Sequence, residues 1–193
     1  AATQLVFLYI LYSEKTEFGT DELAKSLNVS SMTILRAMEE LKHLNIIKQG
    51  IAGKTGRKKL YAPIEKKNYY RIGKEYLVNP VNASFYVDDI PDGITIYKAG
   101  ETALSEQTML AEPAHEVFAT YEKRTSFVNH IVTKAQALAE GLPEIQIMQY
   151  DIGRLTKNQY VDPVSLLMSI TRIDDRTEIA IDELMEGAEW YEE

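Results

Sequence analysis

The chain contains no cysteine. Disulfides, zinc–thiolate sites, iron–sulfur clusters and cysteine nucleophiles are therefore excluded together, and the composition is compatible with a reducing compartment. No apolar run reaches the roughly 18 residues that a membrane helix needs. The apolar segment from Ala2 to Tyr12 lacks the basic front and the cleavage site of a signal peptide. We therefore expect a cytoplasmic protein with no membrane partner.

Histidine is scarce, and the motifs that mark common catalytic sites are missing. His43, His115 and His130 lie far apart, and none belongs to a helical metal-binding pair. There is no Gly-x-Ser-x-Gly elbow and no Walker A motif. Gly53-Lys54-Thr55 lacks the earlier glycine and the following helix of a phosphate-binding loop. We therefore expect no catalytic residue, no bound metal and no cofactor, and hence no enzyme.

Two acidic groups are the only candidates for a hard cation such as Mg²⁺: Asp88-Asp89 with Asp92, and Asp174-Asp175. Both are predicted to lie at turns, where aspartate is favoured because it hydrogen-bonds to nearby backbone amides. A metal-dependent nuclease would combine such acids with a Glu-x-Lys pair on a strand, and the sequence has none in a suitable place. A metal-dependent enzyme acting on nucleic acid is therefore kept only as an alternative.

Positive charge is also in deficit, but unevenly along the chain. The 193 residues carry a net charge of −8. Residues 1–77 hold 13 lysines and arginines against 8 aspartates and glutamates, whereas residues 78–193 hold 8 against 21. This asymmetry is typical of a nucleic-acid-binding module joined to an acidic one. Together with the break at Val78-Asn79-Pro80-Val81, it predicts two domains, 1–77 and 78–193.

The stretch from Thr20 to Leu44 predicts two helices joined by a short turn. We expect Thr20 to cap the first helix, whose apolar stripe is Leu23, Ala24 and Leu27. Asn28-Val29-Ser30 breaks that helix, and Ser30 is placed to cap the second. The second helix repeats apolar residues at helical spacing, at Ile34, Met38, Leu41 and Leu44. Two helices joined in this way form the helix-turn-helix pattern, whose second helix lies in a DNA major groove.

A hairpin with a basic tip is predicted directly after these helices. Short strands at Ile46–Gln49 and Lys59–Ala62 flank a segment that contains three glycines and several basic residues. Such a tip is suited to reach a phosphate backbone or a minor groove. The combined segment, about the first 64 residues, resembles the winged helix-turn-helix of bacterial transcriptional regulators, including MarR-like proteins. The resemblance is carried by Leu23-Ala24, Val29-Ser30, Thr33-Ile34, Arg36-Ala37-Met38, Leu41 and Leu44-Asn45-Ile46-Ile47.

This resemblance implies a set of DNA-contacting side chains. They are Ser31, Thr33 and Arg36 on the second helix, with Lys54, Arg57, Lys58 and Lys59 in the hairpin. Arg36 is the best candidate for a base contact; the alternative is an ion pair with Glu39 or Glu40 one turn further on. Leu35 and Met32 depart from the pattern, because such regulators usually have polar or basic residues there. These two side chains either contact thymine methyl groups or are buried.

The segment from Ile64 to Asn82 interleaves charges with aromatic residues. Tyr69, Tyr70 and Tyr76 are of the kind that stacks on single-stranded bases. We favour instead a connector between the domains, with tyrosines that pack against both of them.

The second half alternates predicted strands and helices. Strands are expected at Phe85–Val87, Ile94–Tyr97, Glu116–Tyr121 and Ile145–Tyr150, and helices at Gly100–Met109, Ser126–Glu140, Pro163–Ile170 and Asp174–Gly187. Asp162 is the expected cap of the third helix, and Gly141 ends the second. Met109 is expected to face inward. Trp190 and Tyr191 suit a contact with a second copy or with a partner protein.

This half also resembles, more weakly, the C-terminal region of bacterial winged-helix proteins related to AbiEi-type abortive-infection antitoxins. The matching residues are Ala99-Gly100-Glu101-Thr102-Ala103-Leu104 with Met109-Leu110, and Val161-Asp162-Pro163-Val164-Ser165-Leu166. The resemblance implies that the N-terminal module binds an operator while the remainder accompanies or opposes a toxin. It transfers no individual functional residue.

The sequence thus predicts an α+β protein in which an N-terminal winged helix-turn-helix is followed by a separate mixed α/β domain. The predicted function is that of a DNA-binding transcriptional regulator. The alternative is an antitoxin of a toxin–antitoxin system that represses its own operon. The expected partners are double-stranded DNA, a second copy in a homodimer, and a toxin or another protein bound through the C-terminal half.

Overall fold

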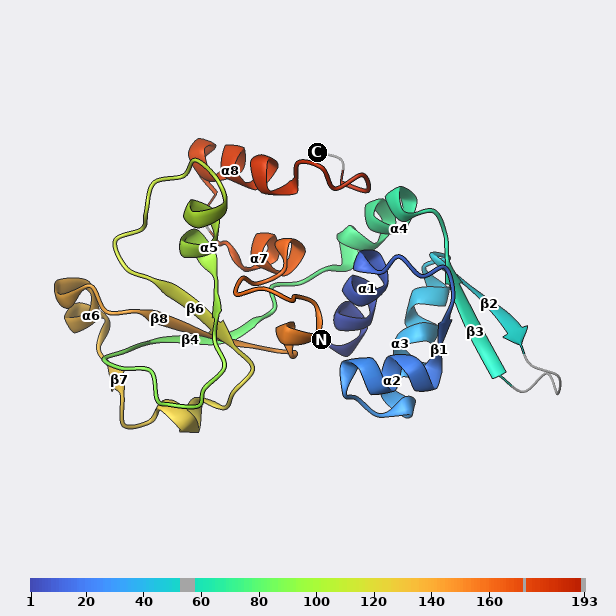
Figure 1. The fold of residues 1–193 in the computed structure, drawn as a ribbon, viewed down its shortest axis with the longest axis horizontal. Coiled ribbons are helices and arrows are strands. Elements are labelled where there is room, and N and C mark those ends of the chain that lie inside the picture. Colours follow the sequence, from blue (N-terminus) through green and yellow to red (C-terminus); the bar gives the residue numbers. More distant parts are fainter. Residues whose placement is uncertain (53–57, 172, 192–193) are drawn as a thin grey trace. The chain divides into compact units, whose positions relative to one another are not determined.

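The chain folds as an α+β protein (Figure 1). The computed structural model describes residues 1–52, 58–171 and 173–191, without the side chains of residues 51, 52 and 58. Backbone contacts divide the chain into two units, Ala1–Leu77 with Ala188–Glu193, and Val78–Gly187. None of the helices in these described ranges combines the length and the apolar composition needed to cross a membrane.

The first unit is built from four helices and a small sheet, apart from one short 3₁₀ turn. Its elements are α1 (Ala2–Tyr12), β1 (Phe18–Gly19), α2 (Thr20–Leu27), α3 (Ser31–His43), β2 (Ile47–Ala52), β3 (Lys58–Pro63), α4 (Lys66–Gly73) and η1 (Lys74–Tyr76). The sheet order is β1-β3-β2, and both pairings are antiparallel. The two helices predicted between Thr20 and Leu44 are confirmed. The β2–β3 hairpin extends away from the helices (Figure 1).

The start and end of each of these helices follow from local chemistry. Ser30 caps α3 as predicted, because its hydroxyl oxygen accepts a hydrogen bond from the Thr33 amide at 3.1 Å. Asn28 ends α2 in the left-handed conformation, with φ at 53°. The prediction that Thr20 caps α2 is wrong by one residue: Gly19 is the cap, and Thr20 already belongs to the helix. Gly19 is extended because it pairs with Leu60 in the sheet.

The predicted connector between the domains is in fact part of the first unit. Glu65 caps α4 by accepting from the Lys67 and Asn68 amides, and these bonds lower the pKa of its carboxyl. Tyr69 is buried and stacks on Phe7 of α1, with ring centroids 4.6 Å apart. The apolar face of this short helix was hidden in the sequence among the charges that surround it. Tyr69 and Tyr70 are therefore not free to stack on nucleic-acid bases.

The last described residues of the chain also belong to the first unit, not to the second domain as predicted. The Trp190 ring lies against Tyr70 of α4, with centroids 4.8 Å apart, and against Tyr12 of α1, with centroids 5.9 Å apart. Tyr191 approaches the Tyr70 ring as well, at 6.0 Å. Trp190 and Tyr191, which were expected to contact a second copy or a partner protein, thus pack against tyrosines of the same chain.

The second unit is a mixed five-stranded sheet with helices. Its elements are β4 (Val81–Val87), β5 (Tyr97–Lys98), α5 (Gly100–Gln107), β6 (Val117–Thr120), η2 (Arg124–Phe127), β7 (Ile131–Val132), α6 (Lys134–Glu140), β8 (Glu144–Met148), η3 (Ile152–Arg154), α7 (Pro163–Ser169) and α8 (Asp175–Met185). The strand order is β5-β6-β8-β4-β7. β6 and β8 are parallel, and the other pairings are antiparallel.

The alternation of β4 and β8 sends apolar side chains to one face of the sheet. Phe85, Val87, Ile145 and Ile147 form a buried cluster there with Phe127. The rings of Phe85 and Phe127 meet edge to face, 5.5 Å apart. The opposite face carries Tyr86, Glu144 and Gln146, which alternate with the core residues along the same strands. Helices α5 and α7 lie on one side of this sheet (Figure 1).

Three predictions about this unit are wrong, and two caps are right. Of the strand expected over Ile94–Tyr97, only Tyr97 lies in β5. The helix expected over Ser126–Glu140 is split into η2, β7 and α6, because Phe127 enters the core and Ile131 pairs with Val87. Gly141 does end α6, with φ at 68°. Asp162 caps α7 as predicted by accepting from Ser165. Met109, expected to face inward, is 91% exposed because α5 already ends at Gln107.

Candidate nucleic-acid interface

Helix α3 is fixed by one face and presents the other to solvent. Ile34, Ala37, Met38 and Leu41 recur at helical spacing and are all buried. The first turn contains no acidic residue. The N-terminal half of the exposed face therefore combines neutral or basic side chains with the positive end of the helix dipole.

Arg36 lies in the middle of this exposed face. It makes no ion pair or hydrogen bond with any residue that the structure describes. The two glutamates considered as its partners are engaged elsewhere: Glu39 pairs with Lys42 at 2.9 Å, and Glu40 accepts a hydrogen bond from the Thr3 hydroxyl. The alternative of an Arg36 ion pair is therefore wrong for the described residues. The guanidinium is left available for an external acceptor.

The other predicted α3 residues lie close to Arg36 along the helix. Ser31 is exposed, and Thr33 is half-buried with its hydroxyl 2.9 Å from that of Ser30. Met32 is 58% exposed, and Leu35 is half-buried. Met32 thus presents an apolar group on the same face, whereas Leu35 is partly covered by the fold. Thr33 is the weaker polar contact, because its hydroxyl already has a partner.

A polar bridge connects α3 with the hairpin. The Lys42 ammonium donates to the Glu39 carboxylate and, at 3.1 Å, to the amide oxygen of Gln49 on β2. The Lys42 hydrogen bond holds the pKa of the Glu39 carboxyl below its usual value, and Lys59 on β3 adds to this effect. The pKa of Tyr61, also on β3, is raised by burial. Lys42 thus joins the helix that carries Arg36 to the hairpin.

The hairpin residues are only partly described. Lys59 is exposed at the position opposite Ile51 on β2. The backbone of Lys58 begins β3, but its side chain lies outside the described residues, as do the whole of Lys54 and Arg57. The predicted basic tip therefore remains a prediction.

In the first unit, most of the described basic side chains without a hydrogen bond or ion pair lie on α2, α3 and the hairpin. Lys25, Arg36, Lys48 and Lys59 form no ion pair or hydrogen bond within the described part of the chain. Elsewhere in this unit, Lys15 pairs with Glu22 and Lys66 with Glu14, Arg71 donates to the amide oxygen of Asn68, and Lys74 lies over the Tyr70 ring. Lys25 and Lys48 were not among the predicted DNA-contacting residues. Both are exposed, and each lies off the apolar side of its own helix or strand.

The acidic groups considered for a cation have local roles instead. The Asp88 carboxylate lies 3.0 Å from Nδ1 of His130, and Asp174 caps α8 by accepting from Thr177. The hydrogen bonds from the backbone and side chain of Thr177 lower the pKa of the Asp174 carboxyl. Within the described ranges, no three histidine, aspartate or glutamate side chains are grouped so that they would hold a metal ion.

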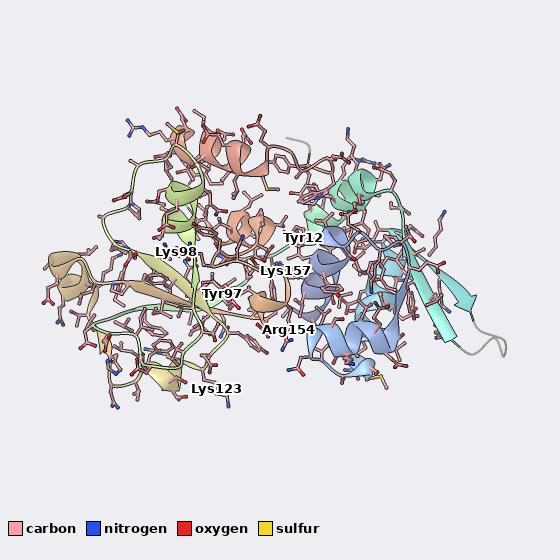
Figure 2. All side chains as sticks on the ribbon, viewed as in Figure 1. Tyr12, Tyr97, Lys98, Lys123, Arg154 and Lys157 are labelled. Atoms are coloured by element: carbon pink, nitrogen blue, oxygen red, sulfur yellow. The ribbon has the colours of Figure 1, made fainter. Side chains whose placement is uncertain are left out.

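The side chains of the second unit include further polar groups on its sheet. Figure 2 labels Tyr97 and Lys98 on β5, where the Lys98 ammonium pairs with Glu106 of α5. This hydrogen bond raises the pKa of Lys98 and lowers that of Glu106. Tyr160 also donates its hydroxyl proton to Glu106 at 3.1 Å. These groups satisfy one another and stabilise the edge of the sheet.

Comparisons with known proteins identified no relative of this chain. No protein-family model, no curated protein and no solved structure was found to match the chain.

Proposed function

We propose that the chain is a DNA-binding transcriptional regulator whose first unit is a winged helix-turn-helix. The observation that carries this proposal is Arg36, an exposed arginine without a partner among the described residues, on a helix anchored by its opposite face. An arginine in this position on a second helix can donate two hydrogen bonds to the edge of a guanine in the major groove.

The order of the elements supports the proposal. A helix, a short strand, two helices joined by Asn28–Ser30 and a two-stranded hairpin follow one another, and the short strand joins the hairpin in the order β1-β3-β2. In a winged helix-turn-helix the hairpin lies beside the recognition helix, and here Lys42 links α3 to β2. The exposed Lys25, Lys48 and Lys59 would contact phosphates without reading the sequence.

The experiment compares two arginine variants. A preferred duplex is first selected from a random pool with the full chain, and binding is then measured by fluorescence anisotropy. Arg36→Ala is expected to weaken binding to the selected duplex by 1–3 kcal/mol, roughly 5- to 150-fold, and to relax the preference for it. Arg71→Ala, which removes the same charge from α4, is the matched control and should have a much smaller effect. Equal losses for the two variants would contradict the assignment of α3 as the recognition helix.

We retain the homodimer as part of this proposal, because winged regulators commonly bind two half-sites. Sedimentation at micromolar concentration tests it. A monomer both free and on a duplex with two half-sites would contradict it.

A second candidate function is an antitoxin that also represses its operon. It is favoured by a mainly apolar groove of about 330 Å³ in the second unit. The groove is lined by Met109, Leu110, Ala111, Ile179 and Ala180, together with the charged Arg176 and Glu183. Ile179 is 60% exposed, so the groove offers an apolar surface to a protein partner. A neighbouring reading frame that encodes a toxin, neutralised when this chain is co-expressed, would support this candidate. Ile179→Asp should then abolish the neutralisation but leave DNA binding intact.

A further inference from the structure

A polar pocket in the second unit has no part in the proposed DNA contact. Its volume is about 380 Å³. Its floor is the sheet face opposite the Phe85 cluster, where Tyr86 of β4 and Glu144 of β8 are register partners and Gln146 follows on the same face. His115, from the segment before β6, and Glu101, from the first turn of α5, complete the polar lining used here. A pocket of this size is in the range of small-molecule sites.

Two buried hydrogen-bonding atoms of this pocket lack partners. They are Oε1 of Gln146 and Nδ1 of His115, and neither bonds to any described residue. The Nε2 atom of His115 faces the Glu144 carboxylate at 3.9 Å. In a neutral imidazole that carries its proton on Nε2, Nδ1 is an acceptor. Buried polar atoms in folded proteins are nearly always paired, so both atoms call for a donor. Both unsatisfied atoms belong to side chains that line the pocket beside the Glu144 carboxylate.

The charge of the lining has one sign. Glu101 and Glu144 are acidic, and none of the described lining residues is lysine or arginine. Burial raises the pKa of the Tyr86 hydroxyl, and the Glu144 carboxylate raises it further. The N-terminus of α5 lies at Gly100, but Glu101 in its first turn offsets the partial positive charge there. The pocket is therefore suited to a positive group and unsuited to an anion.

The arrangement does not fit a serine nucleophile. Ser169 lines the same pocket, but its hydroxyl donates to the Leu166 carbonyl at 2.7 Å instead of to His115. The His115 ring meets the edge of Tyr86 with centroids 5.5 Å apart, and this pair gives the pocket an aromatic wall. A planar group fits beside such a wall.

We propose that this pocket binds a small organic cation whose charge lies on N–H donors: an amidinium, a guanidinium or a protonated amine. Its donors would bond to Oε1 of Gln146 and Nδ1 of His115, and the Glu144 carboxylate would supply the opposite charge. Charge-assisted hydrogen bonds of this type are about twice as strong as neutral ones. The inference does not depend on DNA binding, since every group that it uses lies in the second unit.

Three probes of one shape and different charge test this inference: benzamidine (+1), benzamide (neutral) and benzoate (−1). Binding to the full chain is measured by calorimetry and by ligand-observed NMR up to about 10 mM probe, the range in which a ligand of this size binds weakly. We expect benzamidine to bind at least about tenfold more tightly than benzamide, and benzoate not to bind. Absence of benzamidine binding, or equal affinity for the three probes, would overturn the inference.

Variants locate the binding. Glu144→Gln and Gln146→Leu should each weaken benzamidine binding by about tenfold, the loss of one charged or hydrogen-bonded contact. Gln146→Leu removes an unpaired buried acceptor, so thermal unfolding should show that it remains folded. The matched control is Glu140→Gln on exposed α6, which changes the net charge as Glu144→Gln does and should leave the affinity unchanged. Equal weakening by the control would mean general charge attraction instead of a site.

Discussion

Trp190 is the only tryptophan in the chain, and its ring lies against Tyr70 and Tyr12. Its fluorescence therefore reports whether the last residues are packed on the first unit. Tyr70→Ala should shift the emission toward that of a solvent-exposed tryptophan, because the nearest ring is removed. It should also lower the free energy of unfolding of this unit by about 3–5 kcal/mol, as the loss of a buried aromatic ring does.

The matched control for this prediction is Tyr76→Ala, since Tyr76 is 63% exposed and has no ring contact within the described residues. Its emission spectrum should equal that of the wild type. An unchanged spectrum for Tyr70→Ala as well would contradict the packing of Trp190.

The buried hydroxyl of Tyr70 should make the stability of the first unit depend on pH in the alkaline range. Burial, with a smaller contribution from Tyr191, raises the pKa of Tyr70 from 10.0 to about 12. Below pH 10 the phenol is neutral in the folded and the unfolded chain, so it costs no stability. Between these two pKa values the unfolded chain ionises first, and stability falls as the pH rises. The loss attributable to Tyr70 is at most about 2.7 kcal/mol, because each of the two pKa units corresponds to about 1.36 kcal/mol.

Tyr70→Phe keeps the ring and removes this titration. The variant should therefore lose less stability than the wild type between pH 9 and 11, measured by urea unfolding. Tyr76→Phe is the control, because it removes an exposed phenol. If Tyr70→Phe loses as much stability as the wild type over this range, the phenol is not protected by burial.

At the scale of elements, α4 gives the clearest prediction. A Cβ atom at Gly73 would lie 2.1 Å from Cε2 of Phe7, so α4 approaches α1 where only glycine fits. Gly73→Ala should therefore destabilise the first unit by about 1–3 kcal/mol through overpacking, although alanine is the better helix former. Chemical denaturation followed at Trp190 measures this. A neutral or stabilising effect would mean that the segment is a loose connector, as the sequence had suggested.

The sequence predicted those elements whose signals are local. Ser30, Gly141 and Asp162 each cap a helix by a bond or a conformation that depends on a few neighbouring residues, and all three predictions are confirmed. The signal for α4 was not local in this sense. Its buried side, Tyr69 and Tyr70, becomes apolar surface only once Phe7 and Trp190 cover it.

The split of residues 126–140 has a similar cause. The segment has a helical pattern, but Phe127 is needed in the core and Ile131 pairs with Val87, about forty residues earlier in the chain. Tertiary contacts of this range override local preference.

The candidate sites differ in the same way. Arg36 was predictable, because one helix and its periodicity place it on the exposed face. The pocket was not, because Tyr86, His115 and Glu144 come from three separate segments that are joined only by the pairing of β8 with β4 and β6. Each of these residues looks ordinary in the sequence.

In the whole molecule, the two units differ in net charge, and the chain crosses between them twice. Residues 1–77 carry a net charge of +5, residues 78–187 one of −10, and residues 188–193, which belong to the first unit, one of −3. The chain passes from one unit to the other after Leu77 and returns after Gly187. Under the proposed function, only the first unit attracts DNA, while the second repels it and is left for a ligand or a partner protein.

The salt dependence of binding shows whether the first unit binds duplex DNA through phosphate contacts. The affinity of the full chain for its selected duplex is measured by fluorescence anisotropy between 50 and 300 mM salt, a range over which phosphate contacts weaken strongly. Arg57, Lys58 and Lys59 are replaced together by alanine in a second series. We predict a linear fall of log K with log salt, and a slope about 3 units flatter in the triple variant, because each lost phosphate contact removes about 0.9. No saturable binding by the wild type at 50 mM salt, or slopes that are equal in the two series, would contradict the account.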